Sequence, residues 1–339
     1  MKVAIVTARL SSGDAGGAER FYGALVEAFR VAGHDALEVP VVADESSFQH
    51  IQKNYLACYD LDLSAFDLVV STKAPTWLVR HPRHVCYLVH TIRVFYDMFD
   101  TAFPNPVPEL FAQREWVQKI DTKALSPPHC RALFAIGSEV SQRLKGWNGL
   151  KAEALHPPLW SDAFHVGPLG DYLLLPGRLH AWKRVDLAIR AMRHVNASLR
   201  LIITGTGEAE EGLRALAAND PRIKFRGRMP DAELIELYAG AFAVLFTPVR
   251  EDYGYVTLEA FASGKPVITC SDSGEAAAIV RHDKSGYVCA PDPVVIGEHI
   301  DRLWSKRSRA EAFGRAGRKW VEAQSWSDVV ARLIDASRS

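Results

Sequence analysis

The chain has 339 residues, and its 40 Lys and Arg residues balance its 40 Asp and Glu residues, so the formal net charge is zero at pH 7. A balanced charge gives no reason to expect a nucleic-acid partner, and since no run approaches about 18 apolar residues, no membrane-spanning helix is expected. The length predicts about two domains, and the composition (48% hydrophobic, 24% charged) is typical of a globular protein with an ample core.

Five cysteines are scattered along the chain without any Cys-x-x-Cys pair: Cys58, Cys86, Cys130, Cys270 and Cys289. This pattern predicts buried thiols in a reducing compartment, and neither disulfides nor a zinc site. We therefore expect a cytoplasmic protein. Peripheral contact with the inner face of the plasma membrane stays open, because net charge says little about local patches.

The first half of the chain alternates short apolar strands with helical segments. A helix is predicted from Ala18 to Val31, where apolar residues recur on one face until Gly33 ends it. His156-Pro-Pro-Leu159 breaks the pattern and predicts a linker, since Pro-Pro continues neither a strand nor a helix. Residues 1–160 are thus expected to form one domain, with strands at 3–7, 36–39, 68–70, 85–89, 132–136 and 152–155.

The second half restarts the same alternation, and residues 161–321 are expected to form the second domain. The last helical stretch, about 310–339, breaks at Ser325, so we expect residues 322–339 to return to the first domain. Two doubly wound α/β blocks predict an interdomain cleft at the strand ends. The strands are predicted at 172–175, 199–204, 223–225, 243–246, 267–269 and 286–288, and the earlier helices at 183–194, 208–218, 231–239, 256–263 and 274–280.

Two features of the first domain could bind a ligand. Ser11 to Arg20 joins the first strand to the first helix, and Gly16 and Gly17 allow close backbone approach at that helix N-terminus. The glycine spacing does not fit the dinucleotide fingerprint G-x-G-x-x-G. His90 ends the predicted strand 85–89, where an α/β domain faces its ligand, although a hydrogen-bonded structural histidine fits that position equally well.

The second domain opens with Arg178 and Lys183 on one loop after a strand. Two cations beside a helix N-terminus suit a pyrophosphate leaving group, but Arg and Lys populate most loops, so this signal alone is weak. The loop that contains Gly205 follows another strand, and a plain strand-to-helix turn explains it as well as a ligand role does.

Glu251 and Glu259 form the most informative pattern, E-x7-E, with Gly254 between them. Glu251 is predicted on a strand-to-helix loop and Glu259 about two turns into the helix. Carboxylates accept hydrogen bonds from vicinal hydroxyls, so one glutamate can hold a sugar and the other a ribose, beside amides suited to phosphate. In isolation, two solvated carboxylates would be the simpler interpretation.

Taken together, these motifs resemble the family-4 retaining glycosyltransferases, whose GT-B fold has two facing Rossmann-like domains and a deep interdomain cleft. The resemblance is strongest over residues 173–291. A weaker match in the first half of the chain includes the Gly16-Gly17, His90 and Pro157-Pro158 segments. It rests on many motifs in the family's order: Pro-Gly-Arg178 with Lys183-Arg-Val-Asp, Gly205-Thr-Gly-Glu, Glu251-Asp-Tyr-Gly with Glu259-Ala, and Gly264-Lys-Pro-Val-Ile.

The resemblance implies a role for each matching position. It assigns Arg178 and Lys183 to the donor diphosphate and Gly17 to the phosphates, with Gly16 and Gly205 among the other donor-binding residues. Glu259 would hold the ribose and Glu251 the transferred sugar, while His90 would lie beside the reacting carbon, on a loop fixed by Arg93 and Asp97. The remaining donor contacts would come from Arg228 and Met229 near the base, and from Tyr253, Gly254, Tyr255 and Val256 at the sugar or phosphate.

Within the family, the sequence motifs are most similar to those of GDP-mannose-dependent mannosyltransferases of surface polysaccharide synthesis. Ile92 and Phe261 depart from that pattern, where proline and a methionine-containing helix are usual. We therefore expect a retaining, metal-independent hexosyltransferase that needs no cofactor and acts on a glycan or lipid-linked glycan. A UDP-sugar or other nucleotide-sugar donor is the alternative, and a non-catalytic nucleotide-sugar-binding relative is a second one.

Overall fold

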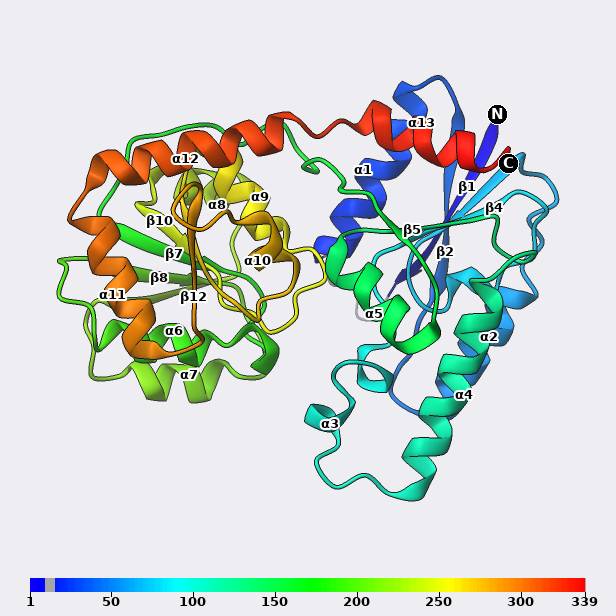
Figure 1. Ribbon diagram of the computed structural model, residues 1–339, viewed down its shortest axis with the longest axis horizontal. Coiled ribbons are helices and arrows are strands. Elements are labelled where there is room, and N and C mark those ends of the chain that lie inside the picture. The colour runs from blue at the N-terminus through cyan, green and yellow to red at the C-terminus, as the bar shows by residue number, and fades with distance from the viewer. Residues whose placement is uncertain (10–15, 339) are drawn as a thin grey trace. The chain divides into compact units, whose positions relative to one another are not determined.

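Two six-stranded parallel sheets, each flanked by helices, organise the chain in the computed structural model (Figure 1). The structure describes residues 1–9 and 16–338. The N-terminal unit comprises Met1–Trp160 together with Ser325–Ser339, and the C-terminal unit comprises Ser161–Gln324. The predicted α/β class with two parallel sheets is confirmed.

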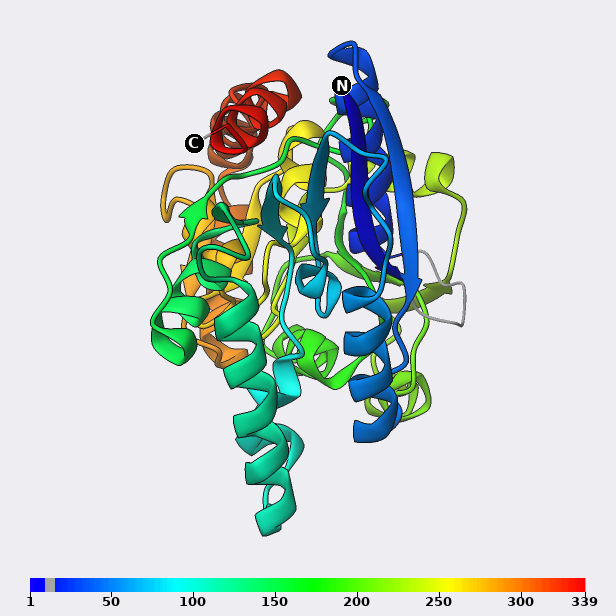
Figure 2. The same cartoon turned by 90° about the vertical axis from the view of Figure 1, so that its right-hand side faces the viewer.

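In the N-terminal unit all six predicted strands are present, with ends shifted by up to three residues. Its strands are β1 (Lys2–Arg9), β2 (Asp35–Val42), β3 (Leu68–Ser71), β4 (His84–Leu88), β5 (Ala132–Ala135) and β6 (Glu153–Ala154). Its helices are α1 (Gly17–Val31), α2 (Phe48–Tyr59), α3 (Phe99–Ala102), α4 (Pro108–Ala124), α5 (Ser138–Asn148) and α13 (Trp326–Ala336). Of the helices before the linker, the sequence predicted only α1. Figure 2 turns this unit toward the viewer, and both views show α4 extending beyond the strands.

The C-terminal unit repeats the alternation. Its strands are β7 (Tyr172–Pro176), β8 (Arg200–Thr204), β9 (Ile223–Gly227), β10 (Ala243–Leu245), β11 (Val267–Cys270) and β12 (Gly286–Cys289). Its helices are α6 (Val185–Met192), α7 (Glu210–Ala217), α8 (Asp231–Gly240), α9 (Tyr255–Ala262), α10 (Glu275–Ile279), α11 (Pro293–Trp304) and α12 (Arg307–Glu322). The sequence located every one of these strands, but it missed α11.

The order of the strands sets where each sheet can bind a ligand. The N-terminal sheet runs β2-β1-β3-β4-β5-β6, and the C-terminal sheet runs β12-β11-β10-β7-β8-β9. In the C-terminal sheet the chain builds outward from β7 in one direction and then returns to β10 on its other side. Loops that leave the carboxyl ends of β7 and β10 therefore diverge, and this reversal of strand order is where open α/β sheets generally bind their ligands.

Burial on both faces explains why inner strands such as β7 are continuous apolar runs. Leu173, Leu174 and Leu175 of β7 are at most 3% exposed, and alternate residues of a strand point to opposite faces. Leu173 and Leu175 pack in one core cluster with side chains of α6, α7, α11 and α12, and α9 contacts β10 and β11. The sheet is thus covered on both sides, as parallel sheets require.

The final helix belongs to the N-terminal unit. In that unit α13 contacts α1 and β4 (Figure 1). The indole Nε1 of Trp326 donates to the carbonyl oxygen of Leu159 at 3.0 Å, and the Trp326 ring lies 6.2 Å from that of Phe21. Ser325 begins the helix as its N-cap, accepting a hydrogen bond from the amide of Asp328. The interruption of the helical pattern at Ser325 is therefore the start of a new helix, α13.

A buried carboxylate ties four segments of the N-terminal unit together. Asp121 of α4 is fully buried and accepts hydrogen bonds from Tyr55 Oη at 2.7 Å, Trp77 Nε1 at 2.8 Å and Tyr96 Oη at 2.7 Å. Burial raises the pKa of Asp121 to about 6, although the three donors oppose that rise. The network joins α2, α4 and the turns before and after β4, so it sets the shape of the segment that follows His90.

Replacing Asp121 with alanine is expected to lower the free energy of unfolding by about 3–5 kcal/mol, because three buried donors lose their shared acceptor. Urea unfolding followed by near-ultraviolet circular dichroism checks this. Asp35→Ala is the matched control: Asp35 is exposed at the start of β2, and its loss should change stability by less than about 0.5 kcal/mol. Equal stability of the two variants would contradict the prediction.

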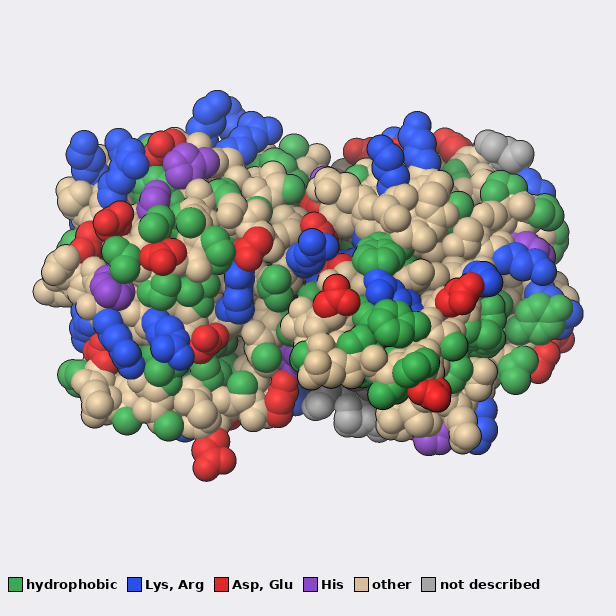
Figure 3. All heavy atoms as spheres, turned by 60° about the horizontal axis from the view of Figure 1, so that its bottom comes forward, with side chains coloured by type: hydrophobic (Ala, Val, Ile, Leu, Met, Phe, Trp, Pro, Cys, Tyr) green, Lys and Arg blue, Asp and Glu red, His purple; other side chains and the backbone are tan. Residues whose placement is uncertain are grey.

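The surface carries both signs of charge, in keeping with the zero net charge. On the face shown in Figure 3, basic and acidic side chains are interspersed over both units, and hydrophobic side chains gather over part of the N-terminal unit. Exposed apolar residues of that unit include Val107, Phe111 and Trp147. Within residues 1–9 and 16–338, no helix has the length and apolar composition needed to cross a membrane. All five cysteines are buried and free, as predicted.

Candidate active site

Most of the predicted site residues lie at one edge of the C-terminal sheet. Arg178 and Lys183 follow β7, Gly205 follows β8, and Arg228 and Met229 follow β9; the segment 251–256 follows β10, and Glu259 lies in α9. Because parallel strands share the direction in which they end, all these loops emerge at the carboxyl edge. The β7 and β10 loops flank the point where the strand order reverses, so Lys183 and Glu251 meet there.

Lys183 and Glu251 form a direct ion pair. Lys183 lies in the short 3-10 turn Ala181–Lys183, and its Nζ donates to Glu251 Oε2 at 2.6 Å. The two side chains are 30% and 18% exposed, so a ligand can reach both. The sequence assigned them separate partners, a diphosphate and a sugar. An ammonium has three donors, and Lys183 can therefore keep Glu251 and still donate to a phosphate oxygen.

Gly254 makes the turn between this ion pair and α9. Its φ of +79° lies in the left-handed region, which residues with a side chain rarely adopt. A Cβ added there would lie 2.8 Å from the Phe246 ring and 3.1 Å from Glu251 Cγ. Glycine thus brings the backbone against the Glu251 side chain. Tyr255 and Val256, which follow at once, open α9, and the first amides of a helix have no partner within the helix.

Glu259 is buried and lies just over one turn into α9, which begins at Tyr255; the predicted depth of about two turns is wrong. Its Oε2 accepts a hydrogen bond from Tyr238 Oη of α8 at 2.5 Å. The neighbouring Tyr255 hydroxyl is also buried, and burial together with the Glu259 charge raises its pKa well above the usual value. A ribose hydroxyl bound by Glu259 would share the carboxylate with Tyr238.

The loops after β7 and β8 touch through their backbones. Gly205 has φ +101°, and a Cβ added there would lie 2.0 Å from the carbonyl oxygen of Gly177. Only glycine permits this approach. Arg178 is exposed on the loop after β7. On the loop after β9, the strand beside β8, Arg228 is exposed and Met229 is partly buried. Tyr253 is buried, and its ring lies 5.3 Å from that of Tyr255.

In the N-terminal unit, His90, Arg93 and Asp97 follow β4. The strand ends at Leu88, so His90 lies two residues beyond it and does not end it as predicted. His90 Nδ1 lies 2.7 Å from the carbonyl oxygen of Thr91. Since a carbonyl oxygen only accepts, Nδ1 carries the hydrogen, and in the neutral ring Nε2 is the acceptor. The ring is therefore oriented by its own loop.

Arg93 and Asp97 of that loop form ion pairs with each other and, through Asp97, with Arg143 of α5. Arg93 Nη2 donates to Asp97 Oδ2 at 2.7 Å, and Arg143 Nε lies 2.8 Å from Asp97 Oδ1. The side chains of Asp97 and Arg143 are both 1% exposed. Arg143 was assigned no role from the sequence. It lies 46 residues from Asp97, so no local pattern connects the two residues.

Gly16 and Gly17 begin α1, after β1. The amide of Gly16 donates to Glu19 Oε2 at 2.7 Å, so a carboxylate of the chain already lies at this helix N-terminus. The earlier part of the predicted loop, residues 11–15, lies outside the described residues. In the C-terminal unit, reasoning from the sequence missed Tyr238, the partner of Glu259, and the pair Arg184–Asp272, in which Arg184 binds the segment that leads to Glu251.

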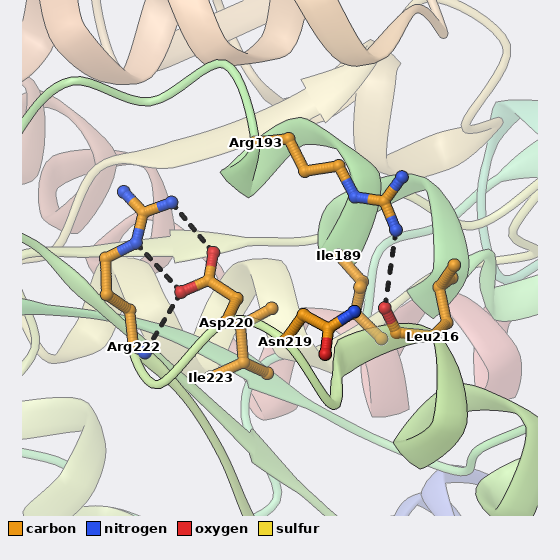
Figure 4. Close-up of a pocket in the computed structure, with 7 residues that line it drawn as sticks. All are labelled: Ile189, Arg193, Leu216, Asn219, Asp220, Arg222 and Ile223. Carbon is orange, nitrogen blue, oxygen red and sulfur yellow. Dashed lines mark hydrogen bonds and ion pairs between the residues drawn. The ribbon is translucent and has the colours of Figure 1, made fainter.

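A cavity of about 510 Å³ lies at the opposite edge of the C-terminal sheet, where α6 and α7 end and β9 begins (Figure 4). Its two cations hold the surrounding loops: Arg222 binds Asp220 at 2.8 Å, and Arg193 donates to the carbonyl oxygen of Leu216 at 3.4 Å. The cavity is therefore separate from the site described above. Its lining comprises Ile189, Arg193, Leu216, Asn219, Asp220, Arg222 and Ile223.

Comparisons with known sequences cover most of this chain. The profile of the family described as "Glycosyl transferases group 1" matches residues 170–320. The human alpha-1,3/1,6-mannosyltransferase ALG2 is 34% identical over 311 residues, which is 80% of this chain and 73% of that protein. A GDP-mannose-dependent alpha-(1-6)-phosphatidylinositol monomannoside mannosyltransferase of Mycobacterium tuberculosis is 36% identical over 44% of this chain and 42% of its own length.

Solved structures share the fold at low sequence identity. Sucrose-phosphate synthase of Thermosynechococcus elongatus superposes with a TM-score of 0.77 at 16% identity, over 99% of this chain and 98% of the other. HepE of Anabaena, solved in complex with UDP and glucose, gives 0.75 at 15% identity, over 99% and 100%. This chain spans less than half of the length of the first curated relatives that it matches.

Proposed function

Because this chain belongs to the group 1 glycosyl transferases, we propose that it transfers a hexose from a nucleotide-sugar donor to a glycan, with retention of anomeric configuration. The observation that carries the proposal is the Lys183–Glu251 pair, 2.6 Å apart and accessible, at the strand-order reversal of the C-terminal sheet. A cation for a leaving diphosphate and a carboxylate for sugar hydroxyls occur there side by side, next to the amides that open α9.

GDP-mannose is the donor that we propose. Two relatives are named as mannosyltransferases, and one of them as GDP-mannose-dependent. A UDP-sugar is the second candidate, since HepE, which shares the fold, was solved with UDP and glucose. The acceptor proposed is a glycan or a lipid-linked glycan, and for the latter the protein would contact the inner face of the plasma membrane peripherally.

The proposed mechanism uses positioning and charge. Arg178 and Lys183 bind the diphosphate and offset the charge that grows on it as the glycosidic bond breaks. Glu251 holds hydroxyls of the transferred sugar, and Glu259 holds the ribose. The leaving phosphate takes the proton of the acceptor hydroxyl on the same face of the sugar. We propose that these cations and helix amides act without a bound metal or cofactor.

Around this centre, the remaining residues have supporting roles in the proposal. The amides near Gly254 and Val256 bind sugar or phosphate, the segment that contains Arg228 and Met229 lies near the base, and Gly17 approaches the phosphates. Interactions present only in the transition state raise kcat.

A non-catalytic nucleotide-sugar-binding relative is the alternative. It would bind nucleotide without hydrolysing the donor or transferring its sugar, so a turnover assay separates the two.

Thermal unfolding with a nucleotide series tests the donor. GDP and GDP-mannose are expected to raise the midpoint of thermal unfolding more than UDP, ADP and their sugars, because at equal concentration the tightest ligand stabilises the folded state most. A ligand at about 100 times its Kd contributes about 2.7 kcal/mol. Donor hydrolysis and transfer are then measured with the best ligand. A larger shift with UDP would favour the UDP-sugar alternative, and binding without turnover would contradict the proposed activity.

The two glutamates are expected to differ in their effects. Glu259→Ala should weaken GDP binding at least about tenfold, because the ribose occurs in every donor and product. Glu251→Gln should leave GDP affinity unchanged or tighter, since it removes a negative charge beside Lys183, and should still impair transfer. Isothermal titration and initial rates measure both effects. Tyr238→Phe controls for the bond that Glu259 also makes within the fold, and equal loss of GDP affinity in both glutamate variants would refute the division of roles.

A further inference from the structure

We infer that Arg184 and Asp272 form a latch that positions residues 247–251, the segment that brings Glu251 to Lys183. They act as positioning residues, without contacting the donor, and this inference rests on the proposed function. Neither residue was assigned a role from the sequence. Arg184 directly follows Lys183, whereas Asp272 lies on the loop after β11, 88 residues further along the chain.

One guanidinium makes four hydrogen bonds to two loops. Arg184 Nε donates to the carbonyl oxygen of Thr247 at 2.8 Å, and Nη2 donates to that of Pro248 at 2.7 Å. Nη1 and Nη2 also donate to Asp272 Oδ2 and Oδ1, at 2.8 and 2.6 Å. The side chain of Arg184 is 20% exposed. A bidentate ion pair of this kind fixes direction as well as distance.

The loops on either side of the latch are bonded to the same segment. The amide of Val249 donates to the carbonyl oxygen of Trp182 at 2.8 Å, and the amide of Arg250 donates to that of Asp272 at 2.9 Å. The amide of Glu251 donates to the carbonyl oxygen of Ser273 at 3.3 Å. The segment that leads to Glu251 is thus held by the β7 loop on one side and by the β11 loop on the other.

Backbone conformation indicates that this arrangement is imposed on the chain. Arg184 and Arg250 have φ of +48° and +47°, and both are residues with large side chains in the left-handed region. Gly274, with φ +63°, lies so close that an added Cβ would be 2.4 Å from the carbonyl oxygen of Glu251. Conformations of this kind persist where the surroundings over-determine them, and here the latch supplies the bonds that do so.

The latch explains how residues 68 positions apart, Lys183 and Glu251, keep a 2.6 Å contact. Releasing Arg184 would free the segment 247–251 from the loop that contains Lys183. Small displacements at a reacting centre lower the rate strongly, because alignment of the reacting groups is lost. Lysine cannot replace Arg184, since it is a point charge without the planar fork of donors.

Two variants of the full chain test the inference, Arg184→Lys and Asp272→Asn. In the free protein, hydrogen–deuterium exchange of the amides of residues 249–251 should rise at least about tenfold in both variants. With GDP-mannose as donor, or UDP-glucose if UDP binds better, kcat should fall about 10- to 100-fold, while the affinity for the free nucleotide stays within about threefold. The double variant should lose no more than the worse single variant, because the two residues act as one unit.

Arg190→Lys is the matched control. Arg190 lies on α6 and pairs with Asp186 at 3.8 Å, with both side chains half exposed, so exchange and kcat should be unchanged. Unchanged exchange in both latch variants, or raised exchange with normal kcat, would overturn the inference. Absence of donor turnover in the unmodified protein would instead overturn the proposed function, while the exchange measurement would still decide whether Arg184 holds the segment.

Discussion

Replacing Lys183 with alanine is expected to lower kcat for transfer by about 100-fold or more, with a smaller rise in KM. The ammonium would stabilise charge that develops on the diphosphate as the bond breaks, and this interaction is strongest in the transition state. The structure adds a second cause. Alanine leaves Glu251, whose side chain is only 18% exposed, without the cation 2.6 Å away, so an uncompensated carboxylate would face the diphosphate.

Initial rates over a range of donor concentrations measure this effect, and circular dichroism verifies the fold. Lys224→Ala is the matched control, because Lys224 is exposed on β9 and its loss should leave kcat unchanged. The double variant Lys183→Ala with Glu251→Gln separates the two causes. It should recover part of the affinity for the donor but little of kcat. An unchanged kcat in the folded Lys183→Ala protein would remove this lysine from the mechanism.

Replacing His90 with alanine is expected to abolish most transfer and most donor hydrolysis while nucleotide binding stays normal, because His90 is proposed to contact the sugar and none of the nucleotide. The proposed task of His90 is to hydrogen-bond a sugar hydroxyl and to stabilise positive charge on the ring. Its bond from Nδ1 to the Thr91 carbonyl, 2.7 Å long, makes Nε2 the acceptor of the neutral ring. We expect a fall in kcat of about 100-fold or more.

Single-turnover rates and isothermal titration with GDP check this prediction together. His90→Gln is informative, because its side-chain amide can still accept a hydrogen bond from a hydroxyl and should retain more activity than alanine. His50→Ala serves as the control in the same unit, since the His50 side chain is 44% exposed on α2. Normal transfer by the folded His90→Ala protein would leave this histidine a structural role only.

Much of the fold was readable from local pattern. Continuous apolar runs such as Leu173 to Leu175 predicted the inner strands, because parallel strands inside a sheet are buried on both faces. Helices were harder. In α4, only Val117, Asp121 and Ala124 are buried, so its apolar stripe is too thin to recognise. Asp121 is itself the reason, since a buried acid counts as a surface residue in any hydrophobic pattern.

The site could be predicted in part, because some of its residues lie close together in the sequence. Gly254, Glu251 and Glu259 lie within one loop and helix, so their spacing alone indicated a carboxylate pair around a tight turn. The predicted depth of Glu259 in α9 was wrong by about a turn, although the predicted helix, 256–263, already began after Gly254 and within one residue of its observed start. Tyr238, which shares the Glu259 carboxylate at 2.5 Å, belongs to another helix and left no local signal.

The sequence by itself therefore determined the alternation of strands and helices, the turns that need glycine, and the residue types gathered on each loop. Only the tertiary structure decided which loops meet. The pairs Lys183–Glu251 and Arg184–Asp272 span 68 and 88 residues, and they form because β10 lies beside β7 and β11 beside β10. Strand order is set by the packing of whole elements, whereas periodicity and turn chemistry are set by neighbours along the chain.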